Sequence, residues 1–136
     1  MNQDGWVQVT PSFAVERIDP AVVFYEDVLG FKAWRPGGGY AYIERNRIAI
    51  RLLEAALYGP DRPGPSHAYV DVLDVERLFA EIAPRLEALP AERWTPPEDQ
   101  PHGQREFSVR DPDGNLVIFG QGIGANAGQW DYRLRG

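Results

Sequence analysis

The stretch that decides the fold is residues 104–119, QREFSVRDPDGNLVIF. At its centre, Asp111-Pro112-Asp113-Gly114-Asn115 supplies a proline whose φ is already set, followed by glycine and asparagine, which tolerate positive φ. Runs rich in apolar and β-branched residues stand on both sides, as in two strands joined by a tight turn. The sequence therefore predicts a β-hairpin here.

The first half of the chain predicts a strand, a helix and three further strands. Residues 6–15 alternate like a strand, and Asp19-Pro20 is a typical helix N-cap followed by proline at the first helical position. Gly30 suits the left-handed residue that ends a helix. A strand at residues 31–35 and a hairpin at residues 40–53, turning near residues 44–47, complete the unit.

The second half predicts the same order of elements. A strand is expected at residues 67–73, followed by a helix that Asp74 caps and that Pro84 should kink or end early. A strand at residues 92–95, a proline-rich loop at residues 96–101 and the hairpin around Asp111 follow. The chain is thus expected to be α+β, with two similar modules.

These modules define the expected domain organisation. Residues 1–136 are predicted to form a single domain, with module one at about 6–56, a Pro- and Gly-rich linker at 57–66, module two at about 67–121 and a tail at 122–136. A single sheet of this size would leave one face open, so the modules must pair, either side by side or across a dimer.

Composition excludes several classes of protein. With 136 residues, 43% of them hydrophobic, the chain can bury one core, and no apolar stretch is long enough to span a bilayer. The start of the chain lacks the features of a secretory signal, so a cytoplasmic location is expected, with no membrane partner. Cysteine is absent, which rules out disulfides and thiolate chemistry. A formal charge of -6 argues against nucleic-acid partners and suits a cationic ligand, or serves only solubility.

Two segments carry a family resemblance. Residues 24–31, FYEDVLGF, together with Arg105-Glu106-Phe107 and the turn at residues 111–115, resemble the vicinal oxygen chelate superfamily, the glyoxalase/bleomycin-resistance/extradiol-dioxygenase group. The resemblance implies two βαβββ modules whose mixed sheets curl into a cup, with helices on the outer side. Members of this superfamily either hold a divalent metal in the cup for catalysis or have lost the metal and bind a ligand there.

The expected metal positions argue against catalysis by a bound metal. In metal-dependent members the ligands lie on the first and last strands of each module, and the matching positions here are Thr10, Ala49, His67 and Ile118. Only His67 is a competent ligand, and one imidazole does not make a site for a divalent ion. His102 with Glu54 or Glu106 is an unorthodox alternative set. No cofactor or metal is therefore predicted, and the chain leans away from being an enzyme.

Strand alternation places other side chains in the cup. Aromatic faces and carboxylates there would suit a planar or cationic guest. We expect Trp6 and Trp130, near the termini, to cover core edges or a subunit interface instead. The predicted lining, in addition to Ser12, consists of Trp34, Tyr40, Tyr42, Arg51, His67, Tyr69, Asp71, His102, Glu106 and Ile118.

Residues 101–107, PHGQREF, are similar to the bleomycin-resistance subgroup. That similarity implies a homodimer that sequesters a cationic glycopeptide antibiotic in clefts at the subunit interface. One departure is His102, which stands where the subgroup commonly carries Trp, so a stacking surface for a flat drug ring is weakened. The sequence thus predicts a metal-independent small-molecule binder. The alternatives are a metal-dependent glyoxalase- or dioxygenase-like enzyme and a non-catalytic sensor or scaffold whose cup is filled by its own side chains.

Overall fold

The computed structural model describes residues 3–59 and 65–131, so residues 60–64 of the predicted linker and 132–136 of the predicted tail lie outside the described part. Module one contains β1 (Ser12–Val15), α1 (Ile18–Asp27), β2 (Lys32–Gly37), β3 (Tyr40–Arg45), β4 (Ile48–Glu54) and the short α2 (Ala55–Tyr58). Module two contains β5 (His67–Asp71), α3 (Val75–Leu86), the 3-10 turn η1 (Ala91–Arg93), β6 (Trp94–Gln100), β7 (Gln104–Arg110) and β8 (Leu116–Gly122). A second 3-10 turn, η2 (Gly124–Asn126), follows β8.

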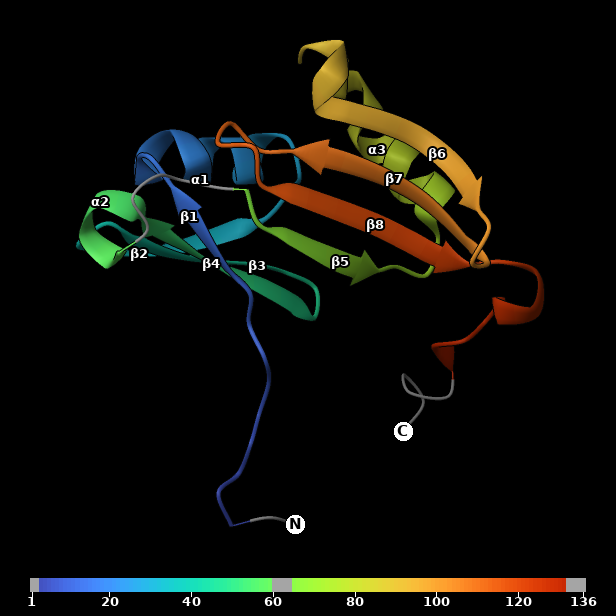
Figure 1. The fold of residues 1–136 in the computed structure, drawn as a ribbon, viewed down its shortest axis with the longest axis horizontal. Coiled ribbons are helices and arrows are strands. Elements are labelled where there is room, and N and C mark those ends of the chain that lie inside the picture. Colours follow the sequence, from blue (N-terminus) through green and yellow to red (C-terminus); the bar gives the residue numbers. More distant parts are fainter. Residues whose placement is uncertain (1–2, 60–64, 132–136) are drawn as a thin grey trace.

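The strands form two four-stranded sheets of the same topology, in the orders β1-β4-β3-β2 and β5-β8-β7-β6 (Figure 1). In each sheet the first strand of the module runs parallel to the last, and the remaining pairs are antiparallel. The predicted α+β fold with repeated βαβββ order is confirmed.

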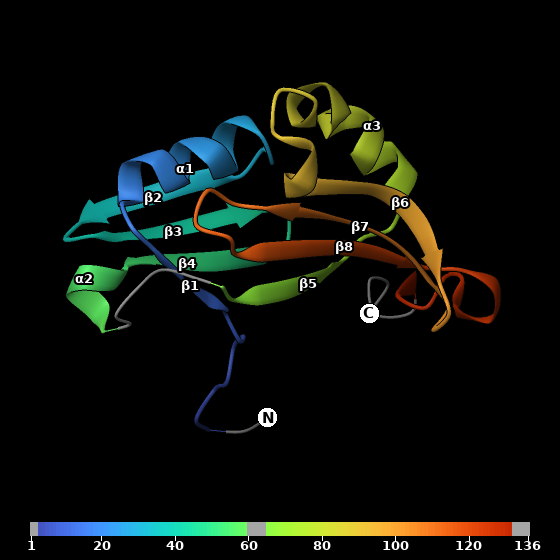
Figure 2. The same ribbon diagram turned by 45° about the horizontal axis from the view of Figure 1, so that its top comes forward.

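Both long helices lie on the same side of the two sheets (Figure 2). Helix α1 buries Ala21, Val22 and Tyr25, and helix α3 buries Ile82 and Leu86, in one hydrophobic core that spans the two modules. Among the described residues, no α-helix lies on the opposite face of either sheet, and we call this face the open face. The apolar alternation of the strands thus buries one set of side chains under the helices and leaves the other set available for function.

The hairpin turn predicted from the sequence also joins the modules. Asp111 is 1% exposed, and its carboxylate accepts hydrogen bonds from the Tyr25 hydroxyl of module one and from the Asn115 side chain, both at 2.9 Å. The Asn115 amide also donates to the Ala14 carbonyl of β1 at 3.0 Å. Gly114 adopts φ +86°, which only glycine tolerates without strain.

The first strand is shorter than the sequence predicted. β1 begins at Ser12, and the segment before it has no strand partner, leaving Trp6 87% and Val9 97% exposed. β1 pairs with β4 only from Ser12 opposite Arg51 onward, and the Pro11 carbonyl accepts the Arg51 amide at 2.9 Å. Alternating apolar residues form a strand only where a neighbour supplies hydrogen bonds, so the prediction of a strand from Trp6 was wrong.

Helix α1 also begins differently, because its cap comes from another part of the chain. Arg17, rather than Asp19, is the N-cap residue, without a capping side-chain bond of its own, and the Glu54 carboxylate at the end of β4 accepts the Ile18 amide at 3.0 Å. The cap predicted for the second helix is confirmed, since the Asp74 carboxylate accepts the Arg77 amide at 3.0 Å.

Two proline predictions require correction. The proline-rich loop expected at residues 96–101 is largely strand β6, an edge strand whose register with β7 shifts between Thr95 and Glu98, where Pro96 and Pro97 stand. Proline is tolerated at such an edge or bulge because no ladder donor is needed there. Helix α3 runs two residues beyond Pro84, to Leu86. Within the described residues, no helix has the length and apolarity needed to cross a membrane.

Candidate ligand-binding face

The open face of the first sheet carries a row of aromatic and cationic side chains. Strand register aligns Ser12 with Arg51, Arg51 with Tyr42, and Tyr42 with Trp34. The Arg51 guanidinium donates to the Tyr40 hydroxyl and lies 5.1 Å from the centre of the Tyr42 ring. Trp34 is 64% exposed. This row offers flat apolar surface, with the Arg51 charge held against tyrosine rings.

The open face of the second sheet carries an acidic row. Register aligns Asp71 with Gly120, Gly120 with Glu106, and Glu106 with Glu98, so three carboxylates cross the sheet from β5 to β6. A Cβ at Gly120 would lie 1.8 Å from the Tyr69 hydroxyl oxygen, so this glycine leaves room for Tyr69 to lie across the row. We define the acidic row as Asp71, Glu106 and Glu98.

The Tyr69 hydroxyl is positioned as a hydrogen-bond donor beside the acidic row. It donates to the Gln104 side-chain oxygen at 3.3 Å. Burial is the main cause that raises the pKa of Tyr69, and the neighbouring Glu106 and Asp71 carboxylates raise it further. The phenol therefore stays protonated at neutral pH and is available as a hydrogen-bond donor.

Glu106 is the most enclosed carboxylate of the row, with its side chain 16% exposed. Its Oε2 lies 2.8 Å from Nε2 of His102, which stands in the turn between β6 and β7 and has its side chain 60% exposed. Because the His102 ring occupies Oε2 of Glu106, this histidine competes with a guest for the same carboxylate.

The structure sorts the predicted site residues into two groups by sheet. Trp34, Tyr40, Tyr42 and Arg51 belong to the first sheet, and His67, Tyr69, Asp71, Glu106 and Ile118 to the second, with His102 in an adjoining turn. Both groups lie on open faces directed to the same side of the molecule (Figure 2). That these residues bind a ligand stays a prediction.

Sequence reasoning missed three residues around the acidic row. Alternation along β7 puts Gln104 on the same face as Glu106, a signal available in the sequence. Glu98 was hidden because its strand was taken for a loop. Trp130 gave no such signal, because it comes from the segment after β8; burial raises the pKa of Asp71, and Trp130 acts to lower it by less.

The four expected metal positions do not form a ligand set. Ala49 and Ile118 occupy open-face positions of β4 and β8, where neither side chain has a donor atom. Thr10 precedes β1, and His67 opens β5. Across residues 3–59 and 65–131, no group of three or more His, Cys, Asp or Glu residues is arranged to hold a metal ion.

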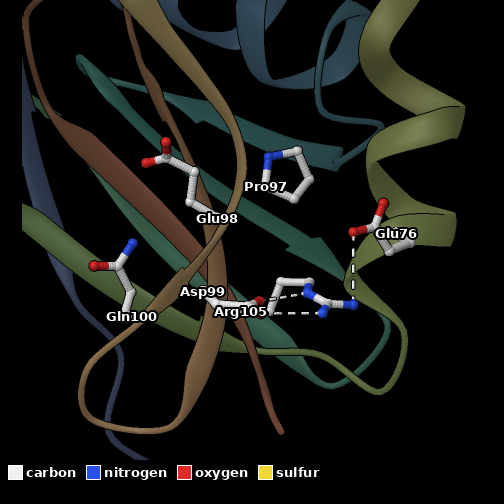
Figure 3. Close-up of a pocket in the computed structure, with 6 residues that line it drawn as sticks. All are labelled: Glu76, Pro97, Glu98, Asp99, Gln100 and Arg105. Carbon is white, nitrogen blue, oxygen red and sulfur yellow. Dashed lines mark hydrogen bonds and ion pairs between the residues drawn. The ribbon is translucent and has the colours of Figure 1, made fainter.

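A separate shallow pocket lies at the edge of the second sheet, next to α3 (Figure 3). Arg105 dominates it, with Nε 2.6 Å from an Asp99 carboxylate oxygen and a second nitrogen 3.8 Å from Glu76. Because Arg105 is already paired with Asp99 and Glu76, this pocket is a poorer candidate for ligand binding than the open faces.

Trp94 packs against Phe79 and the core rather than into the cup.

Comparisons with known proteins agree with this architecture. The family model of the Glyoxalase/Bleomycin resistance protein/Dioxygenase superfamily matches residues 7–119. The bleomycin resistance protein of Geobacillus stearothermophilus is 30% identical, over 86% of this chain and 98% of the relative. The crystal structure of the bleomycin-binding protein of Streptomyces verticillus, complexed with copper(II)-bleomycin, superposes with a TM-score of 0.67 at 25% identity, covering 88% of this chain and 97% of that one.

An enzyme shares the fold as well. Lactoylglutathione lyase from Agrobacterium tumefaciens superposes with a TM-score of 0.63 at 22% identity, covering 85% of this chain and 94% of the enzyme. The fold alone therefore does not distinguish a binding protein from an enzyme. The side chains on the open faces must distinguish them. On the match over residues 7–119 and the similarity along nearly the whole length of its relatives, the chain belongs to the Glyoxalase/Bleomycin resistance protein/Dioxygenase superfamily.

Proposed function

We propose that this protein binds and sequesters a small cationic molecule of the bleomycin type, without a metal ion and without turnover. The observation that carries the proposal is the acidic row, in which Glu106 lies beside Glu98 and is separated from Asp71 by Gly120, on a sheet face that no α-helix of the described residues covers. Cations pair with such carboxylates, and Tyr69 beside the row and Trp34 on the other open face supply flat surface for a planar ring system. The names of the relatives, bleomycin resistance protein and bleomycin-binding protein, support the same ligand class.

The donor set favours binding over catalysis. A metal-dependent enzyme of this fold would need ligands at positions that hold Thr10, Ala49 and Ile118, and a single histidine cannot hold a catalytic divalent ion. Among the described residues of the open faces, no serine, threonine or lysine is hydrogen-bonded to a histidine that could activate it, and the His102 ring contacts Glu106 instead. Sequestration needs none of these groups.

We further propose that the protein acts as a homodimer in the cytoplasm, without nucleic-acid or membrane partners. Among the described residues no α-helix covers either open face, and a second copy would close these faces into clefts. The first sheet carries Arg51 on its open face and the second carries the acidic row, so opposed faces of two copies would bring Arg51 toward carboxylates. Bleomycin would then bind in a cleft between subunits.

The direct test is titration of the purified protein with metal-free bleomycin and with copper(II)-bleomycin, followed by tryptophan fluorescence and calorimetry. We expect saturable quenching with one site per chain, since Trp34 and Trp130 lie on or beside the open faces. Absence of quenching and of heat up to about 50 μM ligand, a level that detects Kd values in the micromolar range, would refute the proposed ligand.

A metal analysis separates the binder from the enzyme. Protein produced in medium supplemented with Ni²⁺ or Fe²⁺ is expected to carry far less than one metal ion per chain after gel filtration. Metal that is stoichiometric and survives gel filtration would favour the enzyme, and an Ala substitution of His67 would then show whether this residue is among the ligands.

A further inference from the structure

Glu106 lies at the centre of the acidic row, in surroundings that favour a donor or a positive charge beside it. In register it lies opposite Glu98 of β6 on one side and opposite Gly120 of β8 on the other. Like charges directly opposite each other on neighbouring strands repel. The Tyr69 hydroxyl occupies the space where a side chain at Gly120 would stand, and the Glu106 side chain is only 16% exposed. A carboxylate enclosed in this way needs a hydrogen-bond donor.

His102 supplies a donor to this carboxylate. Its Nε2 lies 2.8 Å from Oε2 of Glu106. Because an ionised carboxylate only accepts hydrogen bonds, the proton in this contact belongs to the ring, and Nε2 is a protonated nitrogen. The imidazole of His102 therefore stands where the N–H group of a cationic ligand would have to stand to reach Oε2.

The backbone around His102 is held in place, whereas its ring is open to solvent. The turn between β6 and β7 lies beside the segment after β8 (Figure 1). From that segment, the Ile123 amide donates to the Gly103 carbonyl at 3.0 Å. The Asn126 side chain donates to the His102 carbonyl at 3.4 Å. The His102 side chain itself is 60% exposed, so rotation about its own bonds can move the ring away and uncover Glu106 without a movement of the backbone.

We propose that His102 determines which cations the acidic row accepts, because a guest at Glu106 must displace the ring and replace its N–H. This inference rests on the proposed function and deepens it. A primary ammonium, amidinium or guanidinium group carries both a donor and a positive charge, so it can form a charge-assisted hydrogen bond in place of the imidazole. A quaternary ammonium group has the charge but no donor, and it would leave Oε2 of this enclosed carboxylate without a hydrogen bond. The ligand group that binds at Glu106 is therefore a cation that bears N–H.

The first test compares two cations with the same aromatic ring, benzamidine, which bears N–H, and benzyltrimethylammonium, which does not, by chemical-shift titration of the full-length protein. His102→Ala is expected to bind benzamidine about five- to tenfold more tightly than wild type, since no ring has to be displaced, and to bind the quaternary cation within about twofold of wild type. Arg77→Ala removes an exposed cationic side chain from α3, on the helix side of the molecule, and as the matched control should bind both cations like wild type (Figure 2). An equal gain for both cations in His102→Ala, or no binding of benzamidine by this variant at about 20 mM, would overturn the proposal.

The second test observes the ring itself. The chain contains two histidines, and the signals lost in His102→Ala identify His102 in a ¹H-¹⁵N spectrum of the ring nitrogens. In the free protein we expect a proton on Nε2, and on saturation with benzamidine we expect the His102 signals to move toward their positions in Glu106→Ala, in which the carboxylate is absent. Ring signals that stay in place at saturation would refute the displacement, whatever the protein does with bleomycin. Displacement of the ring by benzamidine in a protein that does not bind bleomycin would support the role of His102 and refute only the drug assignment.

Discussion

Replacement of Asp111 by alanine is expected to lower the free energy of unfolding by about 3 kcal/mol, the largest effect of any single polar substitution considered for this chain. The carboxylate is buried and accepts hydrogen bonds at 2.9 Å from the Tyr25 hydroxyl, the Asn115 side chain and the Asn115 and Asp113 amides. Its removal leaves these donors without a partner at the junction of the two modules. Urea denaturation followed by far-ultraviolet circular dichroism measures the change.

Two further variants distinguish the contribution of the contact between the modules from that of the turn at residues 111–115. Asp113→Ala lies in the same turn but removes one hydrogen bond, to the Glu16 amide at 3.1 Å, so we expect a loss of about 1 kcal/mol or less. Burial raises the pKa of Asp113, so its negative charge is less favourable in the folded state than in the unfolded state. Tyr25→Phe should fall between the two. A loss below about 1 kcal/mol in Asp111→Ala would show that water replaces the carboxylate and that the modules do not depend on it.

Asp71→Asn is expected to weaken bleomycin binding by about tenfold to a hundredfold, because the amide keeps the shape of the carboxylate and removes its charge. Calorimetric titration at pH 7 measures the affinity. The same variant is not expected to lose stability. Burial raises the pKa of Asp71, so the ionised carboxylate is less favourable in the folded chain than in the unfolded chain.

The sign of that stability effect follows from proton binding. Between the ordinary pKa of 3.8 and the raised value in the folded state, the folded chain holds the proton more tightly than the unfolded chain. Stability therefore falls as the pH rises through this window and stays at the lower level above it. At pH 7 the neutral Asn removes the unfavourable charge, so the melting temperature of Asp71→Asn should equal or exceed that of wild type.

A matched control isolates the position from the change in net charge. Glu26→Gln removes one negative charge from the exposed side of α1, on the helix side of the molecule, and should leave bleomycin affinity within about twofold of wild type. Equal weakening in both variants would mean that the total negative charge, not the acidic row, attracts the drug. A lowered melting temperature in Asp71→Asn would instead assign Asp71 a structural role.

Local sequence signals predicted a structural feature correctly where residues close in the sequence supply its hydrogen bonds. Asp74 caps α3 with its own side chain, and the turn at residues 111–115 forms with glycine at positive φ, as both motifs predict. Where the partner comes from elsewhere, the local signal failed. Asp19 does not cap α1. The Glu54 carboxylate, 35 residues further along the chain, accepts the hydrogen bond from the Ile18 amide at the start of this helix.

The candidate site divides in the same way. Alternation within strands was enough to place Tyr69, Asp71 and Ile118 on one face, because side chains of a strand point to opposite sides in turn. It was not enough for Glu98, whose strand passes through two prolines, an unfavourable pattern that only an edge position permits.

The sequence by itself determined the repeated strand-helix-strand order, the hairpin turn, the faces of the strands and the lack of donors at three of the four expected metal positions. These properties depend on residue type, spacing and resemblance alone. Only the tertiary structure decided that the three carboxylates form one row and that the segment after β8 packs against Gly122. Strand register and the path of the chain after β8 are set by packing between distant segments, through the space left at Gly120 and Gly122, and no local pattern encodes them.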